Sequence, residues 1–326
     1  NSNVYSIKVL STGKVLIGGD FTSIAGVAKA RLARLDSTGF VDATFNAGLG
    51  PSSTVTTIDT YTDGRIVIGG NFTSVDTIVV PRIARLLVDG AVDTLFDVGA
   101  GFNDYVNKVK VLSDNKLLIA GNFFQYKGLY VPGLVRLYDD GNRDITFLVT
   151  QAQFTGDFET FVIQPNNKII ACGMFYHSSY YKHRKIVRLH ANGVIDTSFK
   201  TGNAIWGSGI ATSGFYGGDK IIIGGSFDQY DSVEVISIAR IDTLGSIDKT
   251  FNLGSGANNE VIDIAQQPDN KLIIAGKFTR YNGARSMRIA RLTPNGLLDT
   301  TFKTNNGFNN QITKVQVQPD GKILVA

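Results

Sequence analysis

The stretch that decides the fold is Lys14-Val15-Leu16-Ile17-Gly18-Gly19-Asp20-Phe21, an apolar run that ends in two glycines, an acidic residue and a phenylalanine. The pattern returns five times, at residues 65–72, 116–123, 168–175, 220–227 and 271–278. Successive runs lie 51 or 52 residues apart. Self-similarity at one fixed period is the signature of a repeat architecture. The chain is therefore built from tandem copies of one unit, which we call a blade.

Two further features recur in every blade. An Arg precedes an Asp by eight residues, and a Phe follows that Asp by three, as in Arg85, Asp93 and Phe96. The six pairs are Arg34 and Asp42, Arg85 and Asp93, Arg136 and Asp144, Arg188 and Asp196, Arg240 and Asp248, and Arg291 and Asp299. An Arg and an Asp on successive strands can form a charge-assisted hydrogen bond. We expect each pair to close a hairpin within its own blade, rather than to form a binding site, and the Phe side chains to fill the core between blades.

Each blade has the pattern of four short strands. The second strand, residues 14–21 in the first blade, is apolar on both faces, which is typical of a strand between neighbouring sheets. The position of Gly19 predicts close backbone approach or a β-bulge. The third strand carries the recurrent Arg, and a turn such as Val88-Asp89-Gly90 leads to the fourth. No segment has a helical period, which excludes a helical solenoid.

A four-stranded sheet repeated at this period predicts an all-β fold, a β-propeller of four-stranded antiparallel blades. Separate sandwich domains would need about 100 residues each. We expect one domain over residues 1–326, with blades starting near 4, 55, 106, 158, 210 and 261 and a partial copy from 312. That copy keeps the pattern to its last residue, which favours seven blades over the alternative of six. It stops inside an expected strand, so we expect the sequence to be part of a longer protein.

The repeat resembles a known family. Residues 82–93 and 288–299 carry Arg-Ile-Ala-Arg-Leu, then Asp-Gly or Asn-Gly, then Asp, and this order is similar to the blade motif of the delta-sixty repeat family of β-propellers. The resemblance covers the whole chain and is specific for the fold. It implies a module of the kind found in tailed-phage structural proteins and in secreted bacterial proteins.

Composition excludes several classes of function. The net charge is +4 and the basic residues are spread along the chain, so we expect no nucleic-acid partner. No apolar run reaches the roughly 18 residues of a membrane span. The single cysteine, Cys172, lies in an apolar strand, which is typical of a buried thiol, and it cannot form an intrachain disulfide.

Residues suited to catalysis or metal binding are scarce. The three histidines, His177, His183 and His190, all lie in blade four without the spacing of a zinc motif. No nucleophile elbow or phosphate loop is present, and the turn aspartates lack the spacing of a calcium loop. We therefore predict no catalytic residue, no metal and no cofactor, and we do not expect an enzyme. A glycoside hydrolase that uses Asp residues stays open, because propellers host such enzymes.

One loop stands out, between the second and third strands of blade four. Its candidate binding residues are Tyr176, His177, Tyr180, Tyr181, Lys182, His183 and Arg184. Aromatic faces with flanking donors suit sugars, and Tyr and Arg are favoured anchors in interfaces. In other blades a Tyr at a similar position is expected simply to pack against its hairpin.

We therefore expect a non-enzymatic module that is a structural, host-binding or glycan-binding component of a phage virion, in a tail or fibre. The expected partners are other proteins of a larger assembly or a cell-surface glycan, and a homo-oligomer would strengthen binding through multiple copies. The first alternative is a secreted or cell-surface bacterial adhesion module. The second is a propeller glycoside hydrolase.

Overall fold

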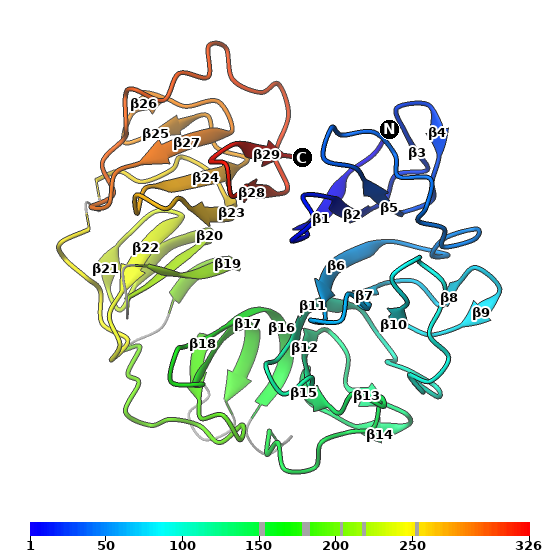
Figure 1. Ribbon diagram of the computed structural model, residues 1–326. Helices are drawn as coiled ribbons and strands as arrows, with labels where there is room; N and C mark the ends of the chain where they lie inside the picture. The colour runs from blue at the N-terminus through cyan, green and yellow to red at the C-terminus, as the bar shows by residue number, and fades with distance from the viewer. Residues whose placement is uncertain (150–153, 178–182, 203–204, 217–219, 252–253) are drawn as a thin grey trace. The chain divides into compact units, whose positions relative to one another are not determined.

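The computed structural model describes residues 1–149, 154–177, 183–202, 205–216, 220–251 and 254–326, which form strands and turns and no helix (Figure 1). Two compact units divide the chain, Asn1–Phe158 and Glu159–Ala326, and each is described by itself. No helix in the described ranges is long and apolar enough to cross a membrane.

Unit one holds the first three blades, each a three-stranded antiparallel sheet. The sheets are β1 (Val4–Val9), β2 (Val15–Gly19) and β5 (Leu32–Leu35); β6 (Val55–Thr60), β7 (Ile66–Gly70) and β10 (Ile83–Leu86); and β11 (Val106–Val111), β12 (Leu117–Gly121) and β15 (Leu134–Leu137). A short hairpin precedes each third strand, formed by β3 (Ser23–Ile24) and β4 (Val27–Ala28), β8 (Ser74–Val75) and β9 (Ile78–Val79), and β13 (Gln125–Tyr126) and β14 (Leu129–Tyr130). Within this unit, β6 packs against both β1 and β11.

Unit two repeats the pattern. Its sheets are β16 (Phe154–Ile163), which begins before the unit boundary, β17 (Ile169–His177) and β18 (His183–Leu189); β19 (Ile205–Tyr216), β20 (Lys220–Tyr230), β21 (Val233–Glu234) and β22 (Ile238–Ile241); and β23 (Val261–Gln266), β24 (Leu272–Gly276) and β27 (Ile289–Leu292), with the hairpin β25 (Arg280–Tyr281) and β26 (Ala284–Arg285). The partial seventh copy forms one antiparallel pair, β28 (Val315–Val317) and β29 (Ile323–Val325).

The expected fourth strand is reduced to a single bridged residue. In blade two, Val92 bridges Leu86, and the next residue, Asp93, donates its N–H to the carbonyl of Arg85 at 2.8 Å. The N–H of Phe96 then bonds to the carbonyl of Asp93 at 3.2 Å. The chain therefore turns immediately instead of extending, and the short hairpin before the third strand is an addition to the predicted pattern.

The predicted close approach at the glycine that ends the second strand is confirmed. A Cβ on Gly70 would lie 2.1 Å from the carbonyl oxygen of Thr54, so no larger residue fits without a shift of the backbone. The pairing of β6 with β7 also shifts register between Val55 and Thr57, which is the predicted bulge. A close approach and a bulge therefore occur at the same point of the blade.

The core lies between neighbouring blades. All five residues of β2, β7 and β12 are buried, as expected for a strand covered on both faces. The recurrent Phe is buried in the same layer, and Phe45 and Phe96 join one core cluster with residues of all three blades of unit one. The first strands are also linked by charge, because Asp59 of β6 pairs with Lys8 of β1 at 2.6 Å and with Lys110 of β11 at 2.9 Å.

Candidate functional site

The recurrent Arg and Asp lie in contact in all six blades. The Arg Nε donates to the Asp Oδ2 at 2.7 Å in the first four blades, 2.8 Å in the fifth and 2.9 Å in the sixth. The pairs are Arg34 and Asp42, Arg85 and Asp93, Arg136 and Asp144, Arg188 and Asp196, Arg240 and Asp248, and Arg291 and Asp299. Each pair joins the third strand to the turn that follows it.

Three more groups complete what we call the Arg–Asp cluster. In blade one, Lys14 at the start of the second strand bonds to Asp42 at 2.8 Å, and the Thr44 hydroxyl bonds to the same carboxylate at 2.6 Å. The guanidinium of Arg34 lies over the ring of Phe45, 4.9 Å from its centroid, in cation–π geometry. The recurrent Phe therefore packs in the core and contacts the charge.

The cluster also links neighbouring blades, which the sequence reasoning missed. Nη1 of Arg34 donates to the carbonyl of Val88, in the turn of blade two, at 2.6 Å. Arg240 reaches the carbonyl of Pro294, in blade six, at 2.7 Å. One buried guanidinium thus holds its own blade's Asp and the turn of the next blade. The Lys and the Thr or Ser of the cluster recur at the same period as the Arg and Asp, and this recurrence was the sequence signal for their part in the cluster.

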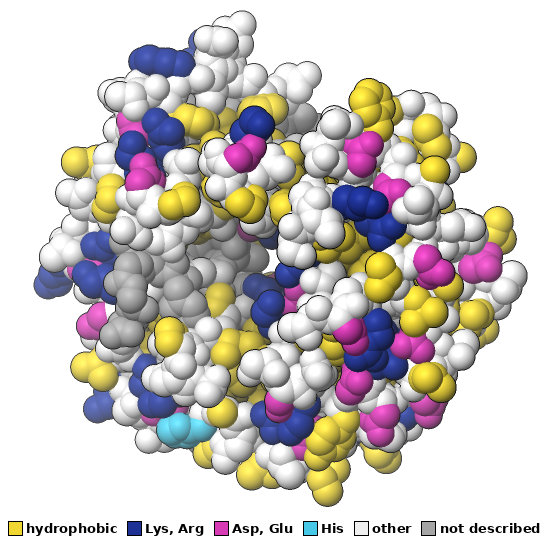
Figure 2. Space-filling model, viewed as in Figure 1, with side chains coloured by type: hydrophobic (Ala, Val, Ile, Leu, Met, Phe, Trp, Pro, Cys, Tyr) yellow, Lys and Arg dark blue, Asp and Glu magenta, His cyan; other side chains and the backbone are white. Residues whose placement is uncertain are grey.

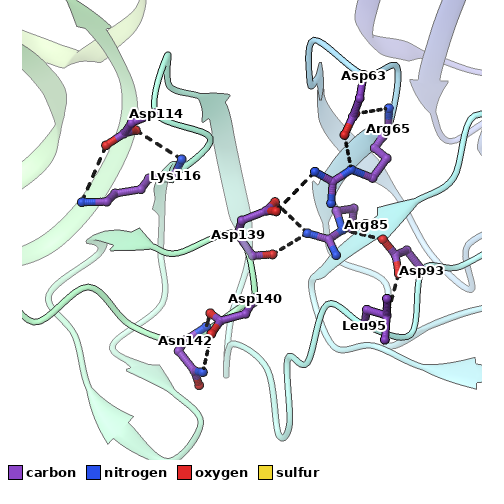
Figure 3. Close-up of polar contacts among 10 residues, drawn as sticks. All are labelled: Asp63, Arg65, Arg85, Asp93, Leu95, Asp114, Lys116, Asp139, Asp140 and Asn142. Carbon is purple, nitrogen blue, oxygen red and sulfur yellow. Dashed lines mark hydrogen bonds and ion pairs between the residues drawn. The ribbon is translucent and has the colours of Figure 1, made fainter.

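Blade two departs from this pattern. Arg65 stands where the other five blades have Lys, and Leu95 stands where they have Thr or Ser. Arg65 turns away from Asp93, bonding to Asp63 at 2.7 Å and to Asp139 of blade three at 3.3 Å. Figure 3 shows Asp139 facing both arginines, since its other oxygen accepts from Nη1 of Arg85 at 2.7 Å.

An open pocket of about 490 Å³ lies beside this network, and we call it the blade-two pocket. It is lined by Arg85, Leu95, Asp114, Lys116, Tyr138, Asp139 and Asp140. Leu95 is 82% exposed, and the partly exposed ring of Tyr138 lies 5.1 Å from Nζ of Lys116. Basic and acidic side chains lie next to one another over blades two and three in Figure 2.

A comparison with family models identifies the fold. Residues 10–45, 62–96, 112–147, 164–199, 219–251 and 267–302 match the family described as "Domain of unknown function (DUF5122) beta-propeller". The chain belongs to the DUF5122 β-propeller family. The match covers six copies, which favours six blades, and the partial copy from residue 312 lies outside the matched ranges.

Solved propellers resemble this one over nearly its whole length. The WD40 β-propeller domain of Doa1 is 13% identical, with a TM-score of 0.59, and the alignment covers 100% of this chain and 90% of that one. A streptogramin B lyase is 14% identical, with a TM-score of 0.57 and coverage of 99% and 90%. YCF48 bound to D1 peptide is 11% identical, with a TM-score of 0.60 and coverage of 99% and 89%. These identities show the fold alone, and a comparison with curated proteins found no match.

Carboxylate partners raise the pKa of two basic groups in and beside the pocket of this DUF5122 propeller. Burial lowers the pKa of Arg65, but its hydrogen bonds to Asp63 and Asp139 outweigh burial and raise that pKa above its ordinary value. The hydrogen bond to Asp144 raises the pKa of Lys116. In the described part of the propeller, no group of three or more His, Cys, Asp or Glu side chains could hold a metal ion. The charged forms of Lys116 in the pocket and of Arg65 beside it are therefore favoured by their carboxylate partners.

The predicted binding loop of blade four lies largely outside the described residues. Tyr180, Tyr181 and Lys182 fall in the segment 178–182, which the structure does not describe. Tyr176 and His177 end β17, and His183 and Arg184 begin β18, with Tyr176 paired to His183 and Phe175 to Arg184 along the backbone. Cys172 is buried, as expected for a structural thiol.

Proposed function

We propose that this propeller is a non-enzymatic binding module and that the blade-two pocket is its ligand site. The observation that carries the proposal is that two departures from the repeat occur together beside one open pocket. Arg65 replaces a Lys and Leu95 replaces a Thr or Ser that the other five blades have. Leu95 lines the open pocket, and Arg65 bonds to Asp139, which also lines it. A repeat that kept its regular residues would satisfy the Asp within the blade, as Lys14 does in blade one. Function on a common scaffold is carried by such local differences.

The pocket has the chemistry of a glycan site. Sugars are bound by an aromatic surface for their apolar face and by polar groups for their hydroxyls. Tyr138 supplies a ring, exposed Asp114 and Asp139 supply acceptors, and Lys116 supplies a donor. We therefore propose that the ligand is a surface glycan with free hydroxyl groups.

We also propose a setting for this module. The delta-sixty resemblance of the blades supports a structural or host-binding role in a phage virion, in a tail or fibre. Seven blades are proposed because β28 and β29 repeat the first two strands of a blade after the sixth copy. The extensive links between blades, such as the bond from Arg34 to Val88, suit a stiff support for a binding surface.

The test is a glycan array probed with the wild-type chain and two matched variants. Tyr138→Ala removes a ring that is 36% exposed in the pocket, and Tyr130→Ala removes a ring that is 37% exposed on the short hairpin of the same blade. We expect Tyr138→Ala to weaken binding to the best glycan at least tenfold and Tyr130→Ala to leave it unchanged. Equal binding of the glycan by the two variants would show that the blade-two pocket is not the binding site. Release of reducing sugar from a bound glycan would overturn the non-enzymatic proposal.

A further inference from the structure

The turn after the third strand of one blade covers the Arg–Asp cluster of the blade before it. Its carbonyl accepts from the Arg, as Val88 does from Arg34 and Pro294 from Arg240. Its glycine lies against the preceding blade's Phe, and a Cβ on Gly296 would come within 2.8 Å of the ring of Phe251. The interface between blades therefore recognises a specific object, a β-turn with a free carbonyl and a glycine.

A main-chain bond completes this recognition. The residue after the recurrent Phe donates its N–H to the turn of the next blade. Asn46 bonds to the carbonyl of Asp89 at 2.7 Å, and Lys200 bonds to the carbonyl of Leu244 at the same distance. An Arg, a Phe and one main-chain N–H together form what we call the turn-docking face of a blade.

Blade six presents the same face without a turn on it. Arg291 holds Asp299 at 2.9 Å through Nε and Thr301 at 3.0 Å through Nη2, and among the described residues no acceptor lies at its Nη1. Its side chain is 20% exposed, against 4–7% for Arg34, Arg85, Arg188 and Arg240. A cavity of about 370 Å³ is lined by Arg291, Phe302 and Lys303, the three parts of the face.

We propose that the turn-docking face of blade six binds a β-turn of the repeat's own type, with Asp or Asn before Gly, supplied by the third and fourth strands of a seventh blade. The first strands of that copy already pack on blade six, because Ile312 and Val315 share a core cluster with Ile273, Ala275 and Ile289. The open face is therefore continuous with an established interface between blades. This inference rests on the seven-blade count proposed above and is independent of the blade-two pocket.

The probe is a cyclic peptide with the sequence of residues 291–299, whose turn docks on blade five within the chain. We expect saturable binding of this peptide to the full chain, measured by isothermal titration calorimetry. A peptide with Val in place of Gly296 should bind at least tenfold more weakly, because a side chain there meets the Phe ring.

Two protein variants locate the binding. Arg291→Lys should weaken peptide binding about tenfold, since it removes the planar donor group. Arg34→Lys is the matched control, because the turn of blade two already covers Arg34, and it should leave peptide binding unchanged. Circular dichroism checks that both variants fold.

Three results would overturn the inference. They are no saturable binding of the peptide at millimolar concentration, equal binding by the Val peptide, and equal binding by Arg291→Lys. A fourth result would come from sedimentation velocity. If the chain forms a dimer and Arg291→Lys dissociates it, the face binds a second copy of the chain and not the turn of a seventh blade. Failure here leaves glycan binding at the blade-two pocket untouched, so the two proposals fail separately.

Discussion

Removing the carboxylate from one Arg–Asp cluster should destabilise the propeller strongly. Asp42 accepts hydrogen bonds from Arg34 at 2.7 Å, from Lys14 at 2.8 Å and from the Thr44 hydroxyl at 2.6 Å. Asp42→Ala leaves the buried guanidinium of Arg34 without its anion. Breaking a buried ion pair by removing one partner costs about 3–5 kcal/mol. Because Lys14 is partly exposed and can reach water, we expect the lower end, a loss of about 3 kcal/mol in the free energy of unfolding.

The assay is urea unfolding followed by circular dichroism, with two comparison variants. Asp63→Ala removes a carboxylate that is half exposed and bonds to Arg65, and exposed pairs of this kind contribute only about 0–1 kcal/mol. Replacing both Arg34 and Asp42 by apolar residues should recover much of the loss, because no buried guanidinium is then left unpaired and the partly exposed Lys14 can be solvated by water. If Asp42→Ala costs no more than Asp63→Ala, the cluster does not stabilise the fold and the reasoning is refuted.

Three further predictions concern stability. Gly70→Ala should lower the free energy of unfolding, measured by urea unfolding, by about 1–3 kcal/mol, because its Cβ would lie 2.1 Å from a carbonyl oxygen. The control Gly214→Ala should leave that free energy nearly unchanged, because its Cβ would meet no atom within 4 Å. Tyr61→Phe should change the melting temperature little, because the buried Tyr61 hydroxyl has no hydrogen-bond partner among the described residues. Stability should be retained above the ordinary Asp pKa of 3.8 and fall as the pH drops below it, because the bond from Lys14 holds the pKa of Asp42 well below that value. Hydrogen bonds outweigh burial and lower the pKa in the same way for Asp144, Asp196, Asp248 and Asp299. A flat acid titration of the unfolding free energy would contradict this.

The regular parts of the blade could be predicted because their partners lie at fixed offsets. Arg85 and Asp93 are eight residues apart in a hairpin, so their spacing alone places them together. The short hairpins, such as β8 with β9, were not predicted, since two residues on each side give no alternating pattern. The fourth strand was expected as a strand because the turn before it resembles a hairpin turn.

The blade-two pocket could not be predicted from local pattern. Arg65 and Asp139 are 74 residues apart and belong to different blades, so their contact depends on how two sheets pack. The signal in the sequence was indirect, and it lay in positions that break the repeat. Aligning the six copies and marking Arg65 and Leu95 as departures would have pointed to this pocket. The aromatic residues of the sequence indicated residues 176–184, of which 178–182 lie outside the described residues.

The most direct test of the binding proposal is a crystal structure of the chain with the glycan that binds best on the array. The account predicts electron density for a sugar ring against Tyr138, with hydroxyl groups within hydrogen-bond distance of Asp139 and Lys116. Density for the glycan at residues 176–184, or elsewhere away from blades two and three, would contradict it.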